Sequence, residues 1–71
     1  MNLPEEPQFP YLEPLQVGDV VQVIDGGRYK NVPVRVIEVW DGNPLMLMPD
    51  GALLVRDRAS VQLLVKAKQF H

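Results

Sequence analysis

The sequence predicts an all-β fold, a small five-stranded barrel that follows an extended, proline-rich arm. Three observations predict it. Short runs rich in valine and leucine alternate with tight glycine-containing turns at a regular spacing. No stretch has the apolar spacing i, i+3, i+4 and i+7 over the length of a sustained helix. Four of the seven prolines lie in the first 14 residues, where they exclude a helix and a central strand.

The arm covers residues 1–14 and the barrel domain covers residues 15–71. The arm carries three acidic residues and no basic one, whereas the domain carries all seven basic residues. The formal net charge of -2 is therefore an average over two unlike parts. Two alternatives stay open for Phe9, Tyr11 and Leu12 at the end of the arm. These residues either fold back to cover part of the barrel or form a docking motif for a partner.

The first two strands follow runs of β-branched residues. We expect the first strand at residues 20–24, with an entry turn at Val17-Gly18-Asp19 and an exit turn at Asp25-Gly26-Gly27. The paired glycines favour a turn because glycine accepts positive φ angles. We expect the second strand at residues 32–40, and the hairpin signal Asp41-Gly42 ends it.

The second half of the chain predicts three shorter strands. Residues 45–48 form the third, which the turn Pro49-Asp50-Gly51 ends. The fourth begins at residue 52 and ends at residue 56 or 58. A single helical or 3₁₀ turn is expected over residues 59–62, and the fifth strand over residues 63–67.

Alternation within these strands predicts the core. The run at residues 36–39 does not alternate cleanly, and a β-bulge near Ile37 and Glu38 reconciles it with one buried face. The residues expected to point inward are Val21, Val23, Val36, Val39, Leu45, Leu47, Leu53, Val55, Val61 and Leu64.

Large apolar residues of the last three strands remain outside this core assignment. If the leucines of the third strand fill the core, Met46 and Met48 face outward or lie beneath the arm. Leu54 and Leu63 on the last two strands are left over by the alternation, and they are a candidate dimer patch.

The first half of the domain resembles a known motif. GDVVQVIDGGRYKN at residues 18–31, with VIEV at residues 36–39, resembles the KOW motif of SH3-like barrels: Gly-Asp-x-Val-x-Val, a glycine, a basic or aromatic loop and Val-x-x-Val. The sequence departs from this pattern at Val34, where the motif has a glycine. The resemblance covers residues 17–65 and implies an SH3-like barrel. Such barrels occur in transcription elongation factors of the NusG kind, in ribosomal proteins and in accessory subunits of photosynthetic complexes.

The residues needed for catalysis and for metal binding are scarce. The only histidine is His71, the only serine is Ser60, and cysteine is absent. No nucleophile–base pair and no metal-ligand spacing can be assembled from them, so we expect no enzymatic activity, no cofactor and no metal. No signal segment opens the chain, and no apolar run exceeds four residues, far below the roughly 20 of a membrane helix. We therefore expect a cytoplasmic protein without membrane insertion.

Binding is the remaining class of function. We expect a non-catalytic protein-interaction module, a regulatory or accessory subunit that binds another protein through the barrel surface. The alternative is a KOW-like RNA-binding module in transcription or translation, which a pI near 5.1 opposes. A homodimer is a third possibility. The expected partner-binding residues, of types enriched in interface hot spots, are Arg28, Tyr29, Trp40, Arg56 and Arg58.

Overall fold

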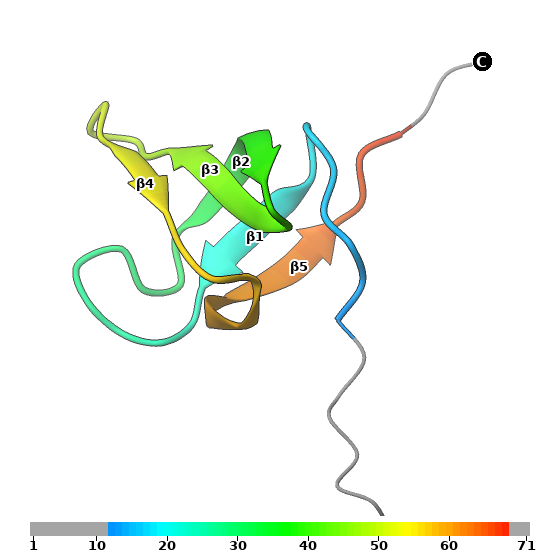
Figure 1. Cartoon of the computed structure of the whole chain (residues 1–71). Coiled ribbons are helices and arrows are strands. Elements are labelled where there is room, and N and C mark those ends of the chain that lie inside the picture. Colours follow the sequence, from blue (N-terminus) through cyan, green and yellow to red (C-terminus); the bar gives the residue numbers. More distant parts are fainter. Residues whose placement is uncertain (1–11, 69–71) are drawn as a thin grey trace, which may run out of the picture.

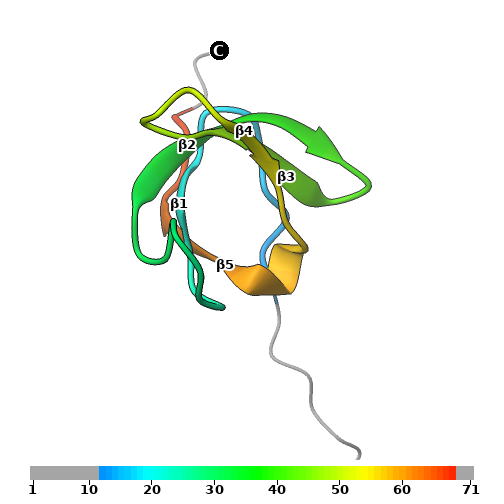
Figure 2. The same ribbon diagram turned by 90° about the vertical axis from the view of Figure 1, so that its left-hand side faces the viewer.

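The computed structural model describes residues 12–68, and over that range the fold is all-β. Five antiparallel strands form one unclosed sheet in the order β4-β3-β2-β1-β5 (Figure 1). The expected all-β class and the number of strands are confirmed, whereas the sheet is not closed into the expected barrel. Figure 2 shows the sheet curling around its interior. The elements are β1 (Val20–Val23), β2 (Pro33–Trp40), β3 (Asn43–Leu47), β4 (Leu53–Val55), a 3₁₀ turn η1 (Arg58–Ser60) and β5 (Val61–Val65).

Most of the proline-rich arm lies outside the described residues, and the two alternatives for Phe9 and Tyr11 lie there as well. The last residues of the arm are described and are tied to the sheet. The Glu13 carbonyl accepts a hydrogen bond from Arg58 Nε at 2.9 Å, and the Pro14 carbonyl accepts one from Lys66 Nζ at 2.9 Å. The chain therefore enters the domain along the region of η1 and β5.

The hairpin and the bulge of β2 have the geometry that the sequence predicts. Asp41 and Gly42 have φ angles of 51° and 82°, and both positive values suit a two-residue hairpin turn. Trp40 pairs directly with Asn43 across this turn. Further back, the register shifts between Val36 and Glu38, so that one residue of β2 has no partner and the strand bends.

The core assignment is confirmed for Val21, Val23, Val36 and Val61, and Val39 packs partly buried against this core. Leu45 is buried as expected but lies outside the core cluster, and the assignment is wrong for Leu47 of β3, for β4 and for Leu64 of β5. Met46 and Met48 are fully buried in the core, whereas they were expected outside it. Leu54 and Leu63, the candidate dimer patch, pack against this core. The buried core cluster is Leu15, Val21, Val23, Val34, Val36, Met46, Met48 and Val61.

The converse error concerns four residues that were expected in the core and are exposed: Leu47, Leu53, Val55 and Leu64. The hairpin register explains the first of them. Val39 is partly buried against the core and pairs with Pro44, so the core face of β3 continues to Met46 and Met48 rather than to the leucines. Met46 pairs with Leu54, so Leu54 is the leucine of β4 that faces the core, and Leu53 faces outward.

A buried carboxylate joins the two ends of the domain. Asp19 is fully buried, and its Oδ1 accepts a hydrogen bond from the Ala67 N–H at 2.7 Å. Its Oδ2 accepts from the Gln16 N–H at 2.8 Å and from Lys66 Nζ at 3.0 Å. Burial raises the pKa of Asp19, but these three donors outweigh it and hold the pKa below its ordinary value.

Gly18 is required beside this carboxylate. Its φ of 96° lies in a region that residues with a side chain rarely adopt, and a Cβ there would lie 3.2 Å from Ala67 Cβ. The Gly-Asp pair that carries the family resemblance therefore has a structural reason in this chain. The glycine lets the backbone turn past Ala67. Asp19, which directly precedes β1, binds the segment after β5 through its hydrogen bonds with Lys66 and Ala67.

Candidate functional site

The face of the β2–β3–β4 sheet that points away from the core is mostly apolar, with Glu38 and Asn43 as its polar residues. Alternation along β3 places Leu45 and Leu47 on this face, opposite the core residue Met46. Leu45 pairs with Val55 and Leu47 with Leu53, so four apolar side chains of β3 and β4 lie side by side. With two residues of β2 they form what we name the outer stripe: Ile37, Trp40, Leu45, Leu47, Leu53 and Val55.

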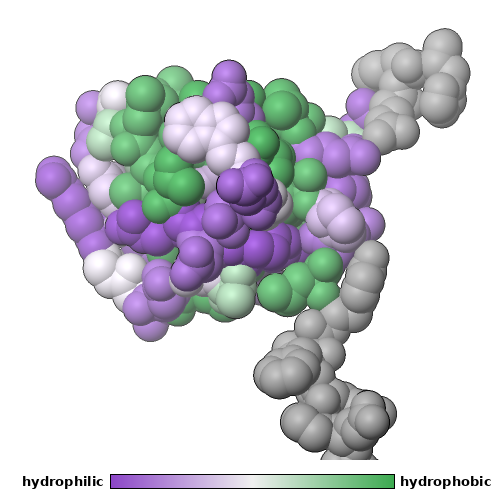
Figure 3. All heavy atoms as spheres, in the orientation of Figure 1, coloured by the Kyte–Doolittle hydropathy of each residue, from purple (hydrophilic) through white to green (hydrophobic). Residues whose placement is uncertain are grey.

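The side chains of the outer stripe are exposed at its margins and buried at its centre. Leu53 is 62% exposed and Trp40 53% exposed, whereas Leu45 retains only 8% of its surface. Leu45 nevertheless lies outside the core cluster, which agrees with its place on the opposite face. Figure 3 shows apolar side chains gathered over β3 and β4, bordered by a hydrophilic band. The stripe thus has a small apolar centre of its own with an uncovered outer surface.

Trp40 is oriented by a neighbour on its own strand. Its indole Nε1 donates a hydrogen bond to Glu38 Oε2 at 2.8 Å. Residues two apart on a strand share a face, so this bond turns the polar edge of the ring back toward Glu38. Glu38 is paired with Leu45, the centre of the stripe. The indole therefore has its polar atom satisfied while half of its surface remains available for contact.

Arg28 and Tyr29 lie in the loop between β1 and β2 and meet the tip of the β3–β4 hairpin at Asp50. The Tyr29 hydroxyl donates a hydrogen bond to Asp50 Oδ2 at 2.8 Å. Arg28 lies 4.0 Å from the same oxygen, and its guanidinium stands 5.8 Å from the centre of the Tyr29 ring. Arg28 and Tyr29 thus lie at the end of the β3–β4 hairpin where Leu47 pairs with Leu53.

The charges of this contact follow from its hydrogen bonds. The pKa of Asp50 is lowered by the Ala52 N–H, which donates to Oδ1 at 3.1 Å, and by the Tyr29 hydroxyl. The pKa of Tyr29 is raised because its hydroxyl proton is held by the Asp50 carboxylate. The loop and the hairpin are therefore joined by an ionised carboxylate and a neutral phenol.

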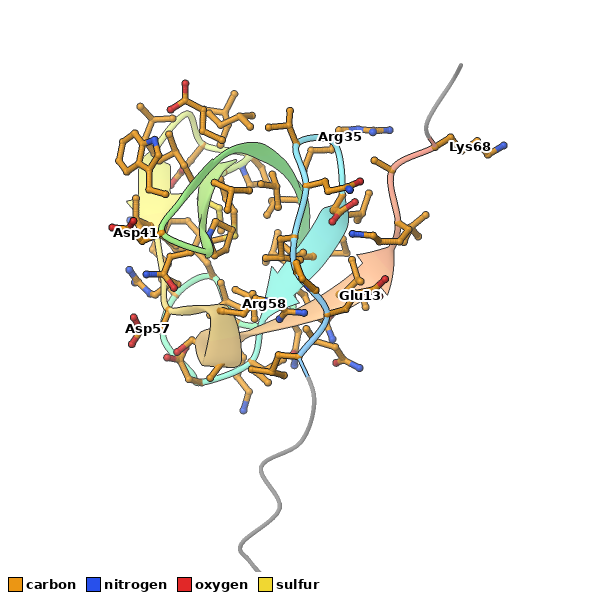
Figure 4. All side chains as sticks on the ribbon, turned by 45° about the vertical axis from the view of Figure 1, so that its right-hand side comes forward. Glu13, Arg35, Asp41, Asp57, Arg58 and Lys68 are labelled. Carbon is orange, nitrogen blue, oxygen red and sulfur yellow. The ribbon has the colours of Figure 1, made fainter. Side chains whose placement is uncertain are left out.

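Arg56 and Arg58 differ in their surroundings. Arg56 is exposed beside Val55 and donates from Nη1 to the Val55 carbonyl at 3.1 Å. Arg58 donates from Nε to the Glu13 carbonyl and from Nη1 to the Val61 carbonyl at 3.1 Å, so its guanidinium holds the end of the arm against the start of β5. Figure 4 shows Arg58 beside Glu13 and away from Arg35 and Lys68.

The structure thus divides the five expected binding residues. Trp40 belongs to the outer stripe, Arg56 lies at its border, and the Arg28–Tyr29 pair lies at its hairpin end. Arg58 has a structural position. Sequence reasoning missed Leu47 and Leu53 as surface residues. Counting partners from the Asp41-Gly42 turn would have found them, because that count places Met46 on the core face and both neighbours of Met46 on the other.

A functional proposal for this chain rests on its own geometry, because the comparisons with known proteins found no match. No family model, no curated protein and no solved structure matches this chain. Within residues 12–68, no group of three or more acidic and histidine side chains is placed to hold a metal ion. The helical content of that range is a single short turn, and none of it is long and apolar enough to span a membrane.

Proposed function

We propose that this chain is a non-catalytic protein-interaction module, a regulatory or accessory subunit that docks another protein on the outer stripe. The observation that carries the proposal is an apolar sheet face, opposite the core, whose central residue is buried while its margins are uncovered. Contiguous exposed apolar surface on a small domain is typical of interaction sites. Tryptophan, tyrosine and arginine at the ends of the stripe are the residue types that dominate interface energetics.

The SH3-like architecture belongs to this proposal. The strand order β4-β3-β2-β1-β5, the single 3₁₀ turn before β5 and the curled sheet of Figure 2 all support it. In such a fold β2 takes part in two halves of the sheet. Here it pairs with β1 through Pro33–Arg35 and with β3 from Val36 to Trp40. The bulge between these halves tilts the outer stripe away from the β1–β5 face.

The size of the stripe favours a short apolar segment of another protein over a second copy of this chain. Four residue steps of β3 and three neighbouring strands give it dimensions of roughly 13 by 10 Å. A stable dimer needs about 800 Å² from each subunit, far more than this area supplies. A segment of a few residues with two or three apolar side chains matches the stripe, and the Trp40 ring borders one end.

The proposal predicts that one aspartate on the stripe abolishes partner binding. Leu53→Asp places a charge at a 62% exposed site, so the fold survives while the docked apolar segment loses its contact. Affinity capture with the tagged chain, from cells that naturally make it, should retain partner proteins at least tenfold less well with Leu53→Asp. Quantitative mass spectrometry measures this loss, and circular dichroism verifies the fold.

The matched control is Ile24→Asp, which also places an aspartate at an exposed apolar residue, 42% exposed and outside the stripe. It should leave capture unchanged. Equal losses with both variants, or no loss with Leu53→Asp, would count against the stripe as the docking site. Sedimentation velocity completes the test. A concentration-dependent dimer that Leu53→Asp abolishes would show that the stripe binds a second copy of this chain and not another protein, which would overturn the proposal.

A further inference from the structure

A second surface feature lies on the other half of the sheet. A pocket of about 430 Å³ opens over β1, β2 and β5. Val20 of β1 pairs with Arg35 of β2 on one side and with Val65 of β5 on the other, so these three side chains form a row on the outer face. The pocket is lined by Val17, Gly18, Val20, Arg35, Val65, Lys66, Ala67 and Lys68.

A bulge in β5 creates the apolar part of this pocket. Val21 pairs with Leu63, but the preceding Val20 pairs with Val65, so Leu64 is an extra residue in β5. Without that insertion, Val65 would follow Leu63 onto the core face. The bulge instead turns Val65 outward, where it is 58% exposed next to Val20. Valine side chains therefore form the floor of a pocket whose rim is charged.

The rim carries positive charge that the domain does not neutralise. None of the lining residues is acidic. Lys66 is paired with the buried Asp19 at 3.0 Å, but within residues 12–68 neither Arg35 nor Lys68 forms an ion pair. Arg35 donates from Nη1 to the Gly18 carbonyl at 3.3 Å, which fixes its guanidinium at the rim with other N–H groups free to donate. In Figure 4 Arg35 and Lys68 both project outward at the same end of the molecule.

We propose that this pocket binds an acidic peptide segment of the partner protein, with carboxylates on Arg35 and Lys68 and one apolar side chain on the valines. The inference rests on the proposed protein-interaction function and names a second, chemically different contact with the partner. A guanidinium held by a backbone carbonyl suits a carboxylate, because the arginine fork is already oriented.

The same observations favour a peptide over RNA. The pocket offers no aromatic ring on which a base could stack. The formal net charge of -2 repels a long polyanion, whereas one or two carboxylates interact with the two cations over a short range.

The experiment uses the full chain and a fluorescein-labelled peptide of eight alternating glutamate and leucine residues, with fluorescence anisotropy as the readout. The matched peptide has glutamine in place of glutamate. We expect the glutamate peptide to bind at least tenfold more tightly than the glutamine peptide. Arg35→Gln and Lys68→Gln should each weaken binding at least fivefold, and Lys30→Gln, a change at an exposed lysine outside the pocket, should leave it unchanged.

Four results would overturn the proposal: no binding, equal binding of both peptides, tighter binding of a single-stranded RNA octamer that depends on Arg35, or an equal loss with Lys30→Gln. A tenfold gain in affinity when Glu5 and Glu6 are both changed to glutamine would also overturn it, because the acidic arm would then be the occupant. Leu53→Asp should leave peptide binding unchanged, so failure of the pocket and failure of the outer stripe are distinguishable.

Discussion

Replacing Asp19 by asparagine is expected to lower the free energy of unfolding by about 3 kcal/mol. The buried carboxylate accepts hydrogen bonds from the Ala67 and Gln16 N–H groups and from Lys66. An amide can accept at one atom only, so at least one of the two backbone N–H donors faces the amide NH₂ group, and the ion pair with Lys66 is lost. A loss of this size is a large part of the stability of so small a domain. Urea denaturation followed by tryptophan fluorescence measures it.

The control for this variant is Asp41→Asn, the same chemical change at an exposed position. Asp41 has a positive φ at the hairpin turn, a conformation that asparagine adopts readily. Its unfolding free energy should therefore stay within about 0.5 kcal/mol of the parent. Equal stabilities of the two variants would show that Asp19 does not join the two ends of the domain.

The pH dependence gives Asp19 a second readout. Its pKa is lower in the folded protein than in the unfolded chain, so the stability it contributes is present above about pH 4 and is lost as the pH falls through the folded pKa. The parent should lose stability below about pH 4 more steeply than Asp19→Asn, which no longer has this carboxyl. Parallel pH profiles for the two proteins would contradict this account of the buried charge.

Met46→Ala is expected to cost about 2 to 5 kcal/mol, because the side chain is fully buried at the centre of the core and its removal leaves a cavity. The adjacent Leu47→Ala should cost less than about 1 kcal/mol, since Leu47 is half exposed on the opposite face. Chemical denaturation of the two variants measures the difference. Similar costs, or a larger cost for Leu47→Ala, would show that the leucines of β3 fill the core.

Local signals in the sequence were sufficient for the elements. The Asp41-Gly42 pair fixed the hairpin, because both positions have positive φ. The uneven run around Ile37 and Glu38 indicated the bulge at the shift in register. The 3₁₀ turn before the last strand is present as η1, but it begins one residue before the predicted range, and β5 begins at Val61 instead of residue 63. Each of these features depends on a few consecutive residues, so a single sequence reveals it.

The face of each strand was harder to predict, because both faces of β3 are apolar. Leucine and methionine alternate from Leu45 to Met48, and hydrophobicity alone does not decide which set is buried. The hairpin register decides it, through the pairing of Val39 with Pro44. Assigning the wrong face of β3 to the core therefore had two consequences. The burial of Met46 and Met48 was missed, and so was the exposure of Leu47 and Leu53 on the outer stripe. The pocket at Arg35 depends on the bulge at Leu64, for which the sequence has no comparable signal.

The most direct test of docking on the outer stripe is photo-crosslinking inside the cells that naturally make this protein. Leu53 is replaced by the photoreactive residue benzoylphenylalanine, and the same replacement at Ile24, an exposed residue outside both the stripe and the pocket, is the control. We expect a discrete adduct with another protein from position 53, none from position 24, and loss of the adduct when Leu47→Asp is added. Equal adducts from both positions, or an adduct that persists with Leu47→Asp, would contradict the proposed docking surface.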